Sequence, residues 1–94
     1  MSGVELRLPS TLADTVGGRR VLVVDPAPPT LAVLLDGLEA EHPALVRRIR
    51  DETGSLRRFV NVYVAGDDVR HLEGLGTHLQ DGDLVQVLPS VAGG

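Results

Sequence analysis

The sequence ends in Asp83-Leu84-Val85-Gln86-Val87-Leu88-Pro89-Ser90-Val91-Ala92-Gly93-Gly94. Here Val85 and Val87 alternate with Gln86 and Leu88, which is the period-2 pattern of a half-buried β-strand. We expect this strand to stop at Pro89, because proline has no backbone N–H to donate to a neighbouring strand. The two terminal glycines lack a Cβ atom, so this end of the chain fits a narrow channel. The stretch predicts a buried strand followed by a slender, flexible tail over residues 89–94.

Length and charge limit the kind of protein. The chain has 94 residues, which suits one domain with a modest core, and we assign residues 1–88 to that domain. The formal net charge of −4 argues against a nucleic-acid partner. No apolar run is long enough to cross a bilayer, and the N-terminus lacks the pattern of a signal peptide. We therefore expect a cytoplasmic protein with no membrane partner.

The residues that usually support catalysis are absent or scattered. The sequence contains no cysteine, which excludes disulfides, thiolate metal sites and a cysteine nucleophile. His42, His71 and His78 do not have the clustered spacing of metal ligands, so surface positions are favoured over a metal site. Asp67-Asp68 and the acidic residues of 81–83 lie in predicted turns, where Asp hydrogen-bonds its own backbone. We predict that the chain is not an enzyme and has no cofactor or metal of its own.

The hydrophobic pattern predicts one main helix and five strands. Leu31, Leu34, Leu35 and Leu38 share one helix face, which begins after an N-cap at Thr30. Pro43 is expected to end this helix, and residues 44–50 form a weaker helical turn. Residues 10–18, which contain Ser, Thr and a Gly pair, are expected to be the turn of an N-terminal hairpin. The strands are predicted at 4–8, 21–24, 58–65, 69–72 and 83–88.

This order, β-β-α-β-β-β, is that of the β-grasp or ubiquitin-like fold in the α+β class. We expect a mixed sheet that is covered on one face by the main helix. The first and last strands are expected to be central and parallel.

The segment Arg58-Phe59-Val60-Asn61-Val62-Tyr63-Val64-Ala65 contains both aromatic residues of the chain. Successive side chains of a strand point to opposite faces, so Val62 and its even-numbered neighbours are expected to meet the helix. Phe59, Asn61 and Tyr63 then share the open face of the sheet. Leu88 leaves the last strand on the same side, next to Pro89. We predict a partner-docking surface formed by these five residues, with Phe59 as a cap on an edge of the core as the alternative.

Several of these segments resemble the ubiquitin-like sulfur-carrier proteins, which include the small subunit of molybdopterin synthase and the sulfur carrier of thiamine synthesis. The turn at 81–83, the apolar strand, Pro89 and the Val91-Ala92-Gly93-Gly94 ending are similar across that wider family. The segment Gly66-Asp67-Asp68-Val69-Arg70 also resembles these carriers. The segment from Phe59 to Val64 resembles the actinobacterial branch that supplies sulfur for cysteine synthesis. The resemblance covers nearly the whole chain.

The resemblance implies a mechanism that uses the carboxyl end. An E1-like enzyme would use ATP to adenylate the Gly94 carboxylate, and a sulfur donor would displace AMP to leave a thiocarboxylate. Gly93, Ala92 and Val91 would form the tail that enters partner active sites. In the cysteine branch, the partners would be a cysteine synthase that depends on pyridoxal phosphate (PLP) and a metal-dependent peptidase. ATP and PLP would be used by those enzymes.

Other interpretations remain. The chain could serve a different sulfur pathway, such as molybdopterin or a sulfur-containing secondary metabolite. It could also be a protein modifier that becomes joined to lysines of its targets. Since the sequence has no lysine, such a modifier could not form lysine-linked polymers of itself. An inert binding domain would leave the Gly-Gly ending without an explanation.

Overall fold

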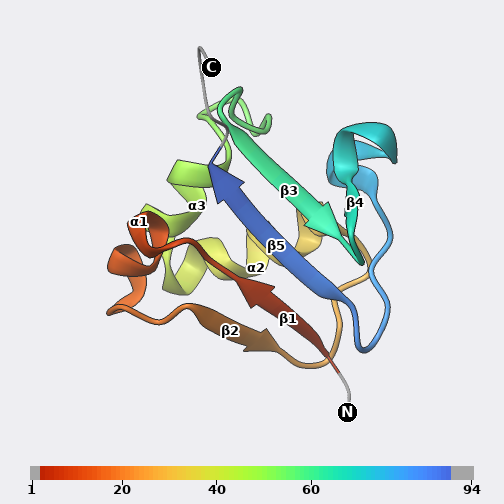
Figure 1. Cartoon of the computed structure of the whole chain (residues 1–94), viewed down its shortest axis with the longest axis horizontal. Coiled ribbons are helices and arrows are strands. Elements are labelled where there is room, and N and C mark those ends of the chain that lie inside the picture. The colour runs from red at the N-terminus through yellow and green to blue at the C-terminus, as the bar shows by residue number, and fades with distance from the viewer. Residues whose placement is uncertain (1–2, 90–94) are drawn as a thin grey trace.

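The computed structural model describes residues 3–89. Within these residues the strands are β1 (Val4–Arg7), β2 (Val21–Val24), β3 (Val60–Val64), β4 (Asp67–Asp68) and β5 (Leu84–Pro89). They form one mixed sheet in the order β2-β1-β5-β3-β4 (Figure 1). β1 and β5 are parallel, whereas β1–β2, β3–β5 and β3–β4 are antiparallel pairs. The prediction that the first and last strands are central and parallel is confirmed.

Helices cover one face of the sheet (Figure 1). The longer helix, α2 (Leu31–Glu41), begins as predicted, with the Thr30 hydroxyl oxygen accepting a hydrogen bond from the Val33 N–H at 3.3 Å. A second helix, α3 (Pro43–Ile49), follows at once. The main helix thus ends before Pro43 as predicted, and the predicted helical turn at 44–50 is a helix that begins at Pro43 itself. Proline is tolerated in the first turn of a helix, where the N–H groups have no partner within the helix.

The core lies between these helices and the sheet. Leucines on one face of α2 and apolar residues of α3 pack against valines that point inward from the central strands. The most deeply buried side chains include Leu31, Leu34, Leu35, Leu45, Ile49, Val62, Val85 and Val87. Because the core lies on one side of the sheet only, the opposite face of the strands remains open.

The connection between β1 and β2 differs from its prediction. Residues 10–16 form a short helix, α1 (Ser10–Ala13), and a 3₁₀ turn, η1 (Asp14–Val16), instead of an irregular hairpin turn. Leu12 and Val16, four residues apart, lie on the same side and are buried in the core. Only Gly17 and Gly18 form the tight turn, with φ values of 71° and 85°. The Ser, Thr and Gly content had hidden this helical spacing.

The predicted strand at 69–72 was also wrong. Val69–His71 form a 3₁₀ turn, η2, and the fourth strand is the residue pair before it. The Asp68 carboxylate accepts a hydrogen bond from the Arg70 N–H at 2.8 Å, which caps this turn. A further 3₁₀ turn, η3 (Gly74–Gly76), follows on the way to β5.

β5 includes Pro89, which we had expected to stop the strand and begin the tail. Ala65 donates to the Leu84 carbonyl, so by the alternation of an antiparallel ladder Val60 and Pro89 form a pair without hydrogen bonds. The nitrogen of Pro89 therefore faces the side of β1, whose pairing with β5 ends at Gln86. No ladder hydrogen bond is lost, and the strand tolerates the proline. The boundary between domain and tail stays a prediction.

Candidate docking surface at the end of the last strand

The residues predicted for docking gather where β5 ends. Asn61 lies directly opposite Leu88, and Tyr63 lies opposite Gln86. Their neighbours Val62 and Val87 are buried against the helices, so Asn61 and Leu88 point to the open face. Leu88 is 43% exposed, although it belongs to a central strand. Asn61, Tyr63 and Leu88 therefore share the open face. Pro89 alternates with Leu88 and lies on the helix side of the sheet like Val85 and Val87, where it is exposed because the strand ends there.

Phe59 precedes β3 and lies in a turn rather than in the predicted strand. Its side chain is 55% exposed and does not belong to the core. The alternative that Phe59 caps an edge of the core is therefore not what the structure contains. The adjacent Val60 opposes Pro89, so Phe59 also lies close to the end of β5.

Arg70 holds the beginning of β3 in place. Its guanidinium donates hydrogen bonds to the Asn61 side-chain oxygen at 2.8 Å and to the Val60 carbonyl at 2.8 Å. A third bond, at 3.1 Å, goes to the Arg57 carbonyl. Sequence reasoning did not find Arg70, because no periodic pattern relates a residue in a 3₁₀ turn to the strand before it.

The open face continues across β1 and β2. Glu5 and Arg7 form an ion pair on β1 at 2.6 Å, on the same face as Gln86. On β2, the side chains of Val21 and Val23 are exposed. The sequence does not predict that these valines are exposed, because Val21–Val24 is apolar at every position and has no alternation to show which side is open. The open face thus has an apolar edge, a charged middle and the cluster at the end of β5.

The remaining predicted site residues are Val91, Ala92, Gly93 and Gly94. They lie outside the described residues, so the structure does not test their role.

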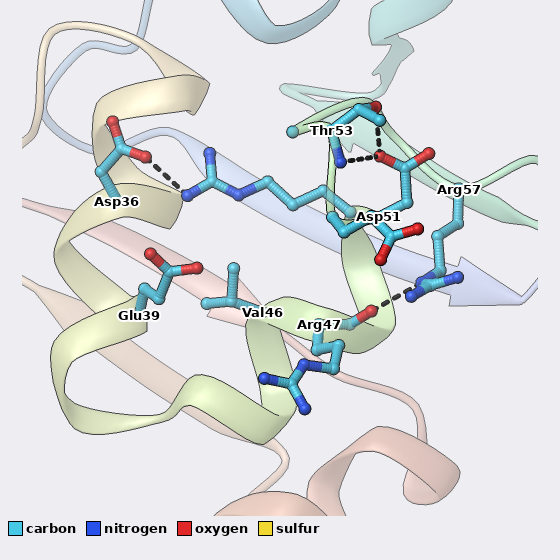
Figure 2. A pocket seen from close by; sticks show the side chains of 10 residues that line it. Asp36, Glu39, Val46, Arg47, Asp51, Thr53 and Arg57 are labelled. Carbon is cyan, nitrogen blue, oxygen red and sulfur yellow. Dashed lines mark hydrogen bonds and ion pairs between the residues drawn. The ribbon is translucent and has the colours of Figure 1, made fainter.

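A polar hollow lies elsewhere, between α2, α3 and the loop of residues 51–57 (Figure 2). Arg50 reaches Asp36 of α2 and forms an ion pair with it, while Arg57 donates to the Arg47 carbonyl at 2.6 Å. The Asp51 carboxylate accepts hydrogen bonds from the Thr53 hydroxyl and N–H. The hydroxyl hydrogen bond lowers the pKa of Asp51 below its usual range. Arg50, Asp36, Asp51 and Arg57 are thus each held by a neighbouring side chain or main-chain group, and these bonds fix the loop against the helices around the hollow.

Residues 3–89 contain neither a cluster of metal ligands nor a membrane-spanning helix. No group of three or more His, Cys, Asp or Glu side chains is placed to hold a metal ion. No helix in this part of the chain has the length and apolar content needed to cross a membrane.

Comparison with known proteins now identifies the family. The model of the ThiS family matches residues 6–94, which includes all of the docking cluster and the Gly-Gly ending. The chain belongs to the ThiS family. This confirms the resemblance to ubiquitin-like sulfur-carrier proteins that the sequence had indicated.

Relatives match over nearly their full length. The sulfur carrier protein CysO of Mycobacterium tuberculosis is 40% identical over 93 residues, which cover 97% of this chain and 98% of CysO. The small archaeal modifier protein 3 of Haloferax volcanii is 41% identical over 93 residues, with the same coverage of 97% and 98%. A chain in the crystal structure of the Amycolatopsis orientalis BexX/CysO complex matches with a TM-score of 0.83 and 36% identity, covering 97% of this chain and 99% of that one.

The structural match confirms the predicted β-grasp fold. These homologues are sulfur carrier and modifier proteins rather than enzymes, which confirms the prediction that the chain itself is not an enzyme.

Proposed function

We propose that this ThiS-family chain carries sulfur as a thiocarboxylate on Gly94, and that the sulfur is used for cysteine biosynthesis. The observation that supports this assignment most strongly is the 40% identity to CysO, which extends over 97% of the chain. The family match also runs through the Gly-Gly ending at residue 94. Because the chain has no cysteine, sulfur has no side-chain thiol to occupy.

In the proposed first step, an E1-like enzyme catalyses attack of the Gly94 carboxylate on the α-phosphorus of ATP. Pyrophosphate leaves, and the product is an acyl-adenylate. A sulfide-level nucleophile then attacks the acyl carbon, the C–O bond to AMP breaks, and a thiocarboxylate remains. The thiocarboxylate sulfur is the nucleophile for the next enzyme, and no other group of the chain reacts.

In the proposed second step, the thiocarboxylate sulfur adds to an aminoacrylate that is held by a PLP-dependent cysteine synthase. An acyl shift from sulfur to nitrogen joins the new cysteine to Gly94 by an amide bond. A metal-dependent peptidase hydrolyses that bond and regenerates the carboxylate. Throughout, the role of this chain is to dock on each enzyme through Phe59, Asn61, Tyr63, Leu88 and Pro89 and to deliver the tail.

The test is reconstitution with an E1-like enzyme, ATP and sulfide, followed by intact-mass analysis. We expect a product in which one oxygen is replaced by sulfur, and no product when Gly94 is deleted. The deletion leaves residues 3–89 unchanged, so its circular dichroism and thermal unfolding should match those of the full chain. Thiocarboxylation of the truncated chain would refute the mechanism.

A second candidate is a protein modifier whose Gly94 is joined to lysines of other proteins. The 41% identity to small archaeal modifier protein 3 favours this candidate. The intact masses of species isolated from the host distinguish the two functions. A thiocarboxylate together with a carrier–cysteine adduct would support the carrier, whereas branched adducts on other proteins would support the modifier.

A further inference from the structure

We infer that Arg70 fixes the orientation of the Asn61 amide, so that Asn61 presents its N–H donors to an activating enzyme. The proposal rests on the function above for the identity of that enzyme. It assigns Asn61 as a specificity residue and Arg70 as a positioning residue. The acceptor on the enzyme would be an oxygen, from a main-chain carbonyl or a carboxylate.

The orientation of the amide follows from the chemistry of its neighbour. A guanidinium has five N–H donors and no acceptor, so the Asn61 atom at 2.8 Å from Arg70 Nη1 must be the side-chain oxygen. Arg70 cannot turn away easily, since it also donates to the carbonyls of Arg57 and Val60. Its main-chain N–H is held in addition by the carboxylate of Asp68. The amide nitrogen of Asn61 is therefore directed away from Arg70.

That nitrogen is available to a partner. Within residues 3–89, Asn61 has a side-chain hydrogen bond to Arg70, and its amide nitrogen donates to no protein atom. No buried side-chain nitrogen or oxygen in this part of the chain lacks a hydrogen-bond partner, so the nitrogen must reach solvent. An amide nitrogen carries two N–H groups. Asn61 thus presents two donors on the open face.

The position of Asn61 explains why an activating enzyme would meet it. Asn61 lies opposite Leu88, a pair whose Cα atoms are about 5.5 Å apart in a ladder of this kind. Five residues separate Pro89 from the end of the sequence, and such a segment spans at most about 17 Å. An enzyme that reacts with the Gly94 carboxylate must hold its active site within this distance of Pro89. Since enzymes are wider than that, its surface covers the end of β5 and the neighbouring Asn61.

The test replaces Asn61 by aspartate. Asn61→Asp keeps an oxygen that accepts from Arg70, while it converts the outward donor into an acceptor. The matched control is Gln86→Glu, which makes the same amide-to-carboxylate change on the same face. Gln86 is the outward-facing residue of β5 that precedes Leu88. Neither variant removes buried apolar volume, so both should unfold at or above the wild-type temperature.

We expect Asn61→Asp to raise the KM for the carrier in ATP–pyrophosphate exchange by about tenfold, with kcat nearly unchanged. Gln86→Glu should change KM by about twofold or less. The difference should persist at high salt, because it reflects a lost donor and a new unpaired acceptor rather than a screened charge.

Three outcomes would overturn the inference. An Asn61→Asp chain with the wild-type KM would show that the donor is not used. Equal losses in both variants would show that charge on the open face matters, and not the direction of the amide. A wild-type chain that no E1-like enzyme activates would refute the proposed function itself, and this outcome is visible before any variant is compared.

Discussion

Val87 and Leu88 are adjacent in β5 but point to opposite faces of the sheet. Truncating Val87 should mainly lower stability, whereas truncating Leu88 should mainly weaken partner binding. Val87 is 2% exposed and packs in the core. Val87→Ala removes two carbon atoms, which are worth about 1.6 kcal/mol of transfer free energy at ~0.8 kcal/mol each. The cavity left behind adds about 1 kcal/mol. We expect the free energy of unfolding to fall by about 2.5 kcal/mol, and the unfolding temperature by roughly 10–20 °C.

Leu88→Ala removes three carbon atoms, which are worth about 2.4 kcal/mol when fully buried. Because Leu88 is 43% exposed, little more than half of this applies. No closed cavity forms at a site that is open to solvent. The expected loss of stability is about 1.3 kcal/mol, half of that for Val87→Ala. If Leu88 is an apolar anchor for the activating enzyme, its truncation should raise KM about tenfold.

The two variants are compared by thermal unfolding and by ATP–pyrophosphate exchange, at a temperature where both are folded. We expect Val87→Ala to be the less stable chain with a near-normal KM, and Leu88→Ala to be the more stable chain with the higher KM. A Leu88→Ala chain with the wild-type KM would refute the docking surface. A KM that rises in both variants in proportion to their instability would show that only folding is being measured.

Two further predictions concern the glycines and the acidic loop. Gly37 lies inside α2 with open space where a Cβ would be, so Gly37→Ala should stabilise the chain by up to about 1 kcal/mol. Gly3→Ala should instead destabilise it by about 3 kcal/mol, because Gly3 has φ +96° and its Cβ would lie 2.5 Å from the Val24 carbonyl oxygen. Denaturant unfolding measures both free energies, and equal effects would contradict the argument. Thr53→Ala should raise the pKa of Asp51 toward its ordinary value, since the Thr53 hydroxyl is the main cause of the lowered pKa. In the wild-type chain, the stabilisation from this carboxylate is present above the pKa of unfolded Asp51 and is lost as the pH falls through the pKa of folded Asp51. An NMR titration in which the variant has the same Asp51 pKa as the wild type would contradict this.

The main elements of the fold could be predicted because their signals are local. The valine alternation of β5 and the leucine spacing of α2 can each be recognised within one short segment of the sequence. The prediction at Pro89 was wrong because the effect of a proline depends on where its missing N–H would point. At Pro43 that N–H would belong to a first helical turn, and at Pro89 it would face past the end of β1. The sequence contains the proline but not that direction.

The site could be predicted only in part. Strand parity placed Asn61, Tyr63 and Leu88 on one face. Arg70 could not be found in this way, because its contact with Asn61 requires the chain to reverse at Gly66 and then to tighten into a 3₁₀ turn. Nor could a run such as Val21–Val24 show its exposed side, since every member is apolar. Sequence patterns thus do not predict the Arg70–Asn61 contact, which depends on a long side chain that extends across a turn.

The place of β5 in the sheet fits a chain that is handled by its carboxyl end. A partner that draws the tail into an active site pulls on Pro89, and β5 is held by β1 on one side and by β3 on the other. An edge strand would have only one ladder to resist that pull, and edge strands open more readily. The side chains of Val85 and Val87 are buried in the core and stabilise the position of β5 further. Under the proposed function, the same strand would present Leu88 to the partner and connect the tail to the core, so docking and delivery would not require the domain to open.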